Sequence, residues 1–246
     1  MLTKTTQAFF SLAILILLSS LTGCTSIPIK ESLLTSQAFT LKLNHGRYGH
    51  TIVNNSEHIF VFGGSGKHGL LSNLEIIDPK TGIIEQVNHV LIPRRYHTAV
   101  WDGKDSIYIM GGMSAVTCGK KRRLLRDPRI EVFDIPSRQS KIIGEMPAAR
   151  RFGSAQYYDD KIFFMGGSRQ YSATSTVGIY DVTKDKWKLT EKMPTPKDTK
   201  TIQRGRYLFT IEGYNGNSPL NAFDRNTICT GKCQSWVAIP QNLQDN

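Results

Sequence analysis

Positively charged side chains gather at two kinds of position in this sequence, and their chemistry suits them to bind an anion. One group lies in the segment from Cys118 to Arg129: Lys120, Lys121, Arg122, Arg123, Arg126 and Arg129. The other group precedes segments of strand character: Arg47, Arg94, Arg95, Arg150 and Arg151. Guanidinium and ammonium groups bind phosphates and carboxylates through charge-assisted hydrogen bonds. The residues we select as candidate anion-binding residues are Arg94, Arg95, Arg151, Lys120, Lys121, Arg122 and Arg123.

Two simpler roles compete with anion binding for these side chains. Arginines at repeated positions usually tie neighbouring blades together by donating hydrogen bonds to carbonyl or Asp oxygens, and this role competes for Arg47, Arg94 and Arg151. A dense run of Lys and Arg is often only a solvated loop. The structure must therefore decide which cations are engaged within the chain.

The cysteines, histidines and acidic residues provide little sign of catalysis. Cys229 and Cys233 enclose a short loop, and we favour a disulfide between them over a zinc site, because no histidine nearby supplies the remaining ligands. His50 and His97 share an Arg-x-x-His pattern and are expected in the core. Four acidic residues end a strand-like segment and are expected to form turns: Asp78, Asp134, Asp181 and Asp224. No nucleophile, metal-protease or nucleotide-binding motif occurs, so we assign no catalytic residue, no metal ligand and no cofactor.

Repeated segments must position the basic residues. A short apolar strand followed by a glycine pair recurs about every 50 residues, a spacing typical of repeat proteins. The copies are HIFVFGG (58–64), SIYIMGG (106–112), KIFFMGG (161–167) and the divergent YLFTIEG (207–213). An Arg-led strand precedes each of the first three copies, and two further strands follow every copy. Short apolar and aromatic runs bounded by turns predict antiparallel meanders.

This order of features resembles the kelch repeat, from about residue 38 to residue 240. The resemblance implies an all-β fold, a kelch-type β-propeller with about four four-stranded blades, either closed or open and truncated. The fourth repeat diverges, since Lys197-Asp198 stands where Arg150-Arg151 would be and Glu212 replaces the first glycine. In such meanders the loops after the glycine pairs share one face with the Arg-led strand starts. Kelch proteins commonly bind partners through these loops, so this face is the expected binding surface.

The N-terminus carries a second resemblance. An apolar stretch (8–18) too short to span a bilayer precedes Leu21-Thr-Gly-Cys24, which resembles the bacterial lipobox. The resemblance implies a signal peptide (1–23), a lipidated linker (24–37) attached through Cys24, and the kelch domain (38–246). A plain signal peptide cut near Gly23 is the alternative. By the same resemblance, Thr25 favours an outer membrane lipoprotein of the bacterial cell envelope, facing the periplasm or the cell surface.

The net charge of +11 favours anionic partners. Export argues against nucleic acid. We therefore expect a lipid-anchored interaction module for an envelope protein or an anionic glycan. The enzymatic alternative is a sugar mutarotase or epimerase acting on an acidic sugar such as sialic acid. A third reading is a decayed, truncated paralogue.

Overall fold

The computed structural model of the chain describes residues 41–118, 121–228 and 236–238. The expectations for the signal peptide, the linker, Cys24, Lys120, Cys229 and Cys233 lie outside these residues. Every regular element within the described residues is a β-strand. None of these residues forms a helix long and apolar enough to cross a membrane.

Four antiparallel sheets of four strands follow one another along the chain, which confirms the predicted all-β fold and its four blades. We call them blades I to IV. Short apolar and aromatic runs, bounded by tight turns at Asp and Gly, explain why each segment folds as a meander. Blade I contains β1 (Thr51–Asn54), β2 (Ile59–Phe62), β5 (Leu74–Ile77) and β6 (Ile84–Val87); blade II contains β8 (Thr98–Trp101), β9 (Ser106–Met110), β12 (Arg129–Asp134) and β13 (Gln139–Glu145). Blade III contains β14 (Ser154–Tyr158), β15 (Lys161–Met165), β18 (Val177–Asp181) and β19 (Lys186–Leu189); blade IV contains β20 (Asp198–Arg204), β21 (Tyr207–Tyr214), β22 (Pro219–Thr227) and β23 (Val237–Ala238).

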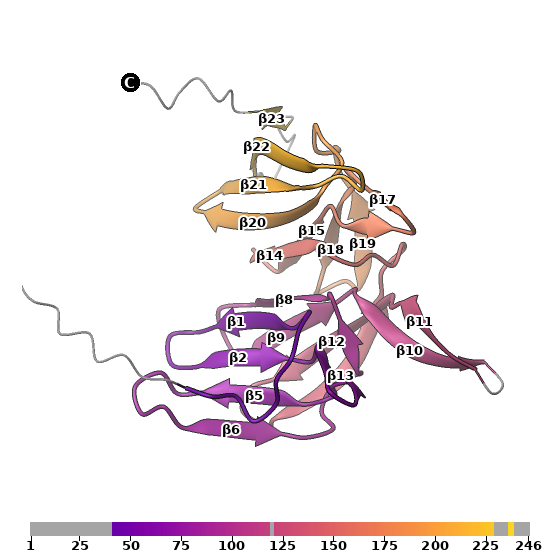
Figure 1. The fold of residues 1–246 in the computed structure, drawn as a ribbon. Coiled ribbons are helices and arrows are strands. Elements are labelled where there is room, and N and C mark those ends of the chain that lie inside the picture. The colour runs from indigo at the N-terminus through magenta and orange to yellow at the C-terminus, as the bar shows by residue number, and fades with distance from the viewer. Residues whose placement is uncertain (1–40, 119–120, 229–235, 239–246) are drawn as a thin grey trace, which may run out of the picture. The chain divides into compact units, whose positions relative to one another are not determined.

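The blades stack in chain order, and their first strands β1, β8, β14 and β20 are successive neighbours (Figure 1). Three apolar clusters fill the spaces between blades. Phe60, Phe62 and Phe133 lie in the cluster between blades I and II, with Ile107 and Ile109. The second and third clusters join blades II to III and III to IV. Within the described residues the sheets do not close into a ring.

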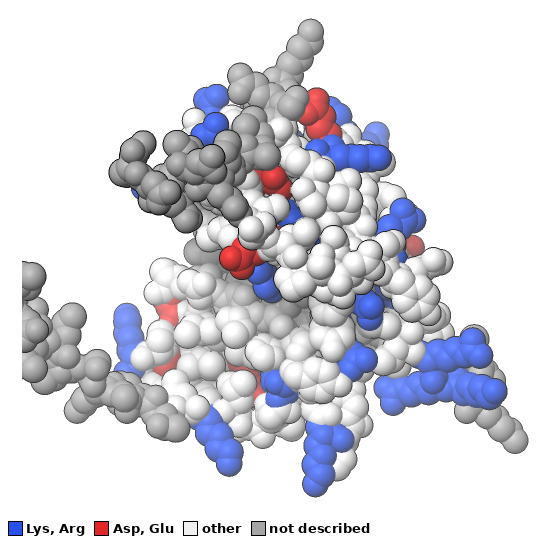
Figure 2. Space-filling view, turned by 45° about the horizontal axis from the view of Figure 1, so that its top comes forward, with Lys and Arg blue, Asp and Glu red and all other residues white. Residues whose placement is uncertain are grey.

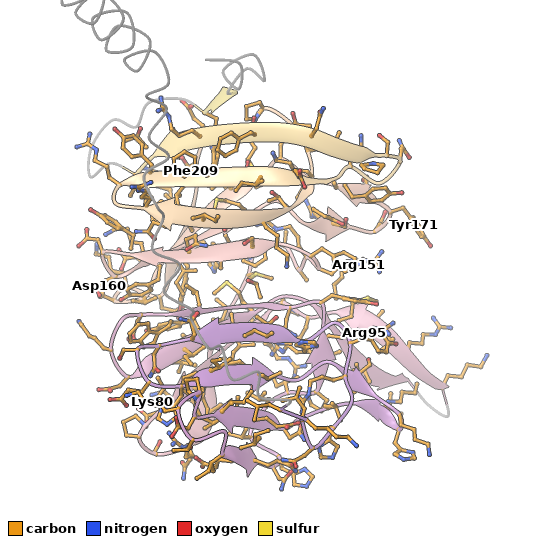
Figure 3. All side chains as sticks on the ribbon, turned by 60° about the vertical axis from the view of Figure 1, so that its left-hand side comes forward. Lys80, Arg95, Arg151, Asp160, Tyr171 and Phe209 are labelled. Atoms are coloured by element: carbon orange, nitrogen blue, oxygen red, sulfur yellow. The ribbon has the colours of Figure 1, made fainter. Side chains whose placement is uncertain are left out.

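The connection between the second and third strands forms a small hairpin in the first three blades. Blade I has β3 (Ser65–Gly66) with β4 (Gly69–Leu70), and blade III has β16 (Ser168–Arg169) with β17 (Ser172–Ala173). Blade II has the longest hairpin, β10 (Met113–Cys118) with β11 (Lys121–Arg126), and β7 (Arg94–Arg95) pairs with its base. We call the end of the propeller that carries these hairpins the loop face. In Figure 3, Arg95, Arg151 and Tyr171 lie at this end, whereas Lys80 and Asp160 lie at the opposite end.

The strand register corrects two parts of the repeat alignment. Asp78, Asp134 and Asp181 accept hydrogen bonds from the turns that follow them, as expected. Asp224, however, pairs with Thr210, so its counterparts are Glu75, Glu131 and Gly178. It is a buried residue that contacts Lys197 and does not form a turn.

The second correction concerns the start of blade III. Thr51, Thr98 and Ser154 each pair with the residue immediately before a glycine pair. Counting back from these positions makes Arg150, rather than Arg151, the equivalent of Arg47 and Arg94. The equivalent of His50 and His97 is then Gly153.

Candidate binding face

Blades II, III and IV each begin with a cation whose backbone carbonyl accepts a hydrogen bond from the preceding blade. The second glycine of the pair is the donor: Gly64 N to Arg94 O (2.9 Å), Gly112 N to Arg150 O (2.8 Å) and Gly167 N to Lys197 O (3.0 Å). The first glycine of each pair has a positive φ and lies against the same carbonyl. The glycine pairs therefore allow consecutive blades to approach closely.

The side chain of this first cation is also used within the chain. Arg94 is only 1% exposed and donates to Gly111 O (3.2 Å), Arg129 O (3.0 Å) and Glu131 Oε2 (2.7 Å). Arg47 bonds Gly63 O and Glu75 in the same way. These partners all belong to the arginine's own blade, so the side chains tie strands within a blade and not neighbouring blades as expected. Because Arg94 is buried and engaged in this way, it leaves the candidate binding set.

The residue after each first cation has a different environment. Arg95 donates to Tyr48 Oη (2.6 Å), and its guanidinium lies 4.9 Å from the centre of the Tyr96 ring. Arg151 lies 5.1 Å from the centre of the Phe152 ring and donates to Met113 Sδ (3.5 Å). Both guanidiniums are half-buried and have no carboxylate ion-pair partner within the described residues. They therefore keep positive charge available at the loop face.

The aromatic rings of Tyr96 and Phe152 lie beneath these two arginines. Tyr96 and Phe152 have positive φ angles of 58° and 59°, and Gly49 holds the equivalent position in blade I. Tyr96 N donates to Gly49 O (2.7 Å) and Phe152 N donates to Tyr96 O (3.0 Å), while the two rings lie 4.4 Å apart. These blade-to-blade bonds fix the rings beneath the guanidiniums. The sequence places aromatics beside arginines, but the left-handed backbone could not be predicted from it.

The β10–β11 hairpin carries the basic run as an extended ribbon and not as an irregular loop. Arg122 pairs with Thr117 and Arg123 with Val116, and the side chains of Lys121, Arg122 and Arg123 are exposed. Lys and Arg side chains gather on this projecting hairpin in Figure 2. Because β7 pairs with β10, the hairpin and Arg95 belong to one small sheet.

A cavity of about 400 Å³ lies between this hairpin and the β3–β4 hairpin of blade I. Arg95, Arg122 and Arg123 line it together with Lys67 and Tyr48. Three predicted binding residues therefore meet at one cavity, and Tyr48 is 54% exposed beside them. Arg151 does not line this cavity. The sequence did not single out Lys67, because it lies in a short hairpin with no Lys or Arg beside it in sequence.

A second cavity, of about 800 Å³, lies between β11 and the β16–β17 hairpin. Arg126 and Arg169 line it, along with Pro147 and Ala149. Nearby, burial raises the pKa of Asp198, which accepts a hydrogen bond from Ser168 Oγ (2.5 Å).

Among the described residues, no group of three or more His, Cys, Asp or Glu side chains is arranged to hold a metal ion.

The repeated four-stranded sheets agree with a comparison to known protein families. Residues 49–241 match the family described as the KLHDC2/KLHL20/DRC7 Kelch-repeats domain. The chain belongs to the kelch-repeat family. Kelch repeats suggest a protein-interaction module.

Two curated proteins are similar to parts of this kelch-repeat chain. Alpha-scruin of Limulus polyphemus is 26% identical over 125 residues, which cover 49% of this chain and 13% of alpha-scruin. Kelch-like protein 25 of Xenopus tropicalis is 28% identical over 153 residues, which cover 62% of this chain and 24% of that protein. The similarity thus spans less than a quarter of the length of either relative.

Proposed function

We propose that this kelch-repeat chain binds an anionic partner, an acidic protein segment or an anionic glycan, at the loop face. The observation that carries the proposal is the convergence of Arg95, Arg122 and Arg123 with Lys67 on the cavity of about 400 Å³. Arg95 has a fixed position, since Tyr48 and Tyr96 hold its guanidinium. The exposed hairpin arginines add charge that can adjust to the ligand.

The balance of charge and aromatic surface supports this choice of ligand. Cations that share a concave site attract anions, and the attraction weakens as salt screens it. Tyr48 presents a ring that can stack on a sugar or pack against an apolar side chain. No observation in the described residues favours the mutarotase alternative over binding.

Two soluble polyanions test the proposal: poly-glutamate for an acidic protein and polysialic acid for an acidic glycan. The double variant Arg122→Glu/Arg123→Glu should weaken binding of the preferred polymer at least about tenfold at low salt in a fluorescence anisotropy titration. The matched control is Lys186→Glu/Lys188→Glu, which reverses two exposed charges on β19. Equal losses of affinity in both variants would show that the effect depends only on net charge. Unchanged affinity in Arg122→Glu/Arg123→Glu would refute the proposed site.

We further propose that the chain is anchored to the bacterial envelope by lipid at Cys24. The support is the lipobox resemblance of Leu21–Cys24 after an apolar stretch. Lipid chains contribute about 0.8 kcal/mol per buried CH₂ to membrane binding. The Cys24→Ala variant should leave the membrane fraction of expressing cells, whereas a membrane-bound Cys24→Ala protein would refute lipid anchoring.

A further inference from the structure

Blade IV presents a sheet face that every earlier blade buries against its successor. In blades I to III, the residue just before the glycine pair points to the next blade and is fully buried: Phe62, Met110 and Met165. Ile211 holds this position in blade IV and Phe209 lies two residues before it, yet both are only half-buried. We call this side of blade IV the forward face.

Glu212 shows that the forward face is not built to receive a further blade in the usual way. A Cβ atom at Gly63, Gly111 or Gly166 would lie 2.9, 2.6 or 2.3 Å from the first carbonyl of the next blade. Glu212 occupies the equivalent position, at φ +50°, and has a Cβ. A following blade docked like the others would therefore clash with it. The same clash argues against a second copy of the chain docking blade I onto blade IV.

The forward face combines apolar side chains with cations. Register places Ile202 opposite Phe209 and Phe223 opposite Ile211, so all four share this face. Ile202 is 54% exposed and Phe223 is 36% exposed. Phe209 stacks on Phe223, with ring centres 5.6 Å apart.

Three cations lie on the same face by the same register. Lys200 is opposite Ile211, Arg204 is opposite Tyr207, and Arg225 is opposite Phe209. The Arg225 guanidinium lies 5.4 Å from the centre of the Tyr207 ring. Glu212, which the register skips, is the one carboxylate that we place on this face between Lys200 and Arg225, so the cations outnumber it; Asp224 points to the opposite side, toward Lys197.

We propose that the forward face of blade IV is a second interaction surface, which docks an acidic amphipathic segment of a partner protein. The apolar residues of that segment cover Ile202, Phe209 and Phe223, and its carboxylates pair with the surrounding cations. This surface is on blade IV and is independent of the loop-face cavity. The cations exclude basic partners and the apolar strip supplies most of the contact, which matches the composition of protein interfaces.

Two designed amphipathic peptides of equal length test the proposal with the full chain, one composed of Leu and Glu and the other of Leu and Lys. In fluorescence anisotropy titrations, the Leu/Glu peptide should bind at least about tenfold more tightly than the Leu/Lys peptide, and added salt should narrow the difference. The Ile202→Ser/Phe223→Ser variant should lose binding of the Leu/Glu peptide. The Leu189→Ser variant removes an exposed apolar side chain of blade III, which is 65% exposed, and should retain binding of the Leu/Glu peptide.

Urea unfolding of Ile202→Ser/Phe223→Ser shows whether that variant keeps the fold, and Arg204→Ser/Arg225→Ser tests the charges without touching the apolar strip. Equal binding of both peptides would refute the charge selection. Leu/Glu peptide binding that survives in Ile202→Ser/Phe223→Ser, or that is lost only in Arg122→Glu/Arg123→Glu, would refute the forward face. Self-association of the unliganded chain that disappears in Ile202→Ser/Phe223→Ser would overturn the proposal in favour of a second copy.

Discussion

Blades II and III hold the same guanidinium in the same place and neutralise it differently. Arg94 donates to Gly111 O and Arg129 O, and Arg150 donates to the equivalent oxygens, Gly166 O (2.9 Å) and Thr176 O (2.9 Å). Blade II adds a carboxylate, Glu131, at 2.7 Å from Arg94.

Blade III has Gly178 where blade II has Glu131. Trp187 fills the space, because a Cβ at position 178 would lie 2.8 Å from its ring. The Arg150 guanidinium lies 4.6 Å from the centre of the Phe164 ring. Burial, followed by the charge of Arg169, lowers the pKa of Arg150 to about 10.

This difference shows which contacts of the blade-start cation are the same in both blades and which differ. The two carbonyl bonds occur in both blades, so they fix the position of the cation. The negative partner can be replaced by an aromatic ring, since the face of a ring attracts a cation. Blade II nevertheless depends on its carboxylate, because its guanidinium has no such ring beside it.

The largest expected effect is therefore on the Arg94–Glu131 pair. Glu131→Gln should lower the free energy of unfolding by about 3 kcal/mol, because it leaves the buried Arg94 guanidinium with only the more distant carboxylate of Asp127, 4.0 Å away, as counter-charge. Urea unfolding measures the loss. Glu85→Gln is the control, since Glu85 pairs with Arg138 at the surface and its loss should cost under about 1 kcal/mol. A cost of Glu131→Gln as small as that of the control would mean that carbonyl bonds suffice in blade II also.

The second difference between these blades is His97, which blade III replaces with Gly153. Burial, followed by the charges of Arg94 and His50, lowers the pKa of His97 from 6.5 to about 3. The unfolded chain therefore binds a proton between these values and the folded chain does not, so stability is lost as the pH falls below about 6.5.

Between pH 7 and pH 5 this residue should cost about 2 kcal/mol of unfolding free energy. Urea unfolding at the two pH values measures the change. His97→Gln should reduce this pH dependence, whereas His68→Gln, a change at an exposed histidine, should retain it. An equal pH dependence in wild type and His97→Gln would contradict the assignment.

The smallest expected effect concerns the space beside Trp187. Gly178→Ala should destabilise blade III by about 1 kcal/mol, because the added methyl group meets the Trp187 ring and forces it to shift. Thermal unfolding measures the change. Stabilisation by this substitution, as expected when glycine in a strand merely loses entropy, would show that Trp187 does not fill the site.

The sequence predicts the number of blades, the pairing within them and the face that gathers the basic residues, because these follow from a repeated pattern. It cannot decide between Arg150 and Arg151 as the blade-start residue. Both are arginines, and only the register and the bond from Gly112 to Arg150 O distinguish them. The sequence alignment placed Asp224 with Asp78 and Asp134, because LNAFD resembles LEIID and IEVFD. The strand register instead aligns Asp224 with the residues three positions before those two aspartates.

The sequence predicts only part of the candidate site, because a residue that is isolated in sequence gives no signal. The hairpin arginines stand out as a run, whereas Lys67 and Arg169 are isolated in sequence and reach the site only through their short hairpins. Arg94 and Arg95 are adjacent in sequence, yet Arg94 is buried and Arg95 lines the cavity.

The hydrogen bond from each second glycine to the next blade-start carbonyl has a consequence for how such a chain grows and changes. Gly64 donates to the carbonyl of Arg94, and Gly112 donates to the carbonyl of Arg150. During synthesis a blade can therefore form this backbone bond only after the next repeat has begun to leave the ribosome. The unit that recombination can duplicate or delete without loss of these bonds thus begins at the cation and ends just before the next cation. Sequence boundaries placed at the glycine pairs would sever each repeat from the carbonyl that completes it.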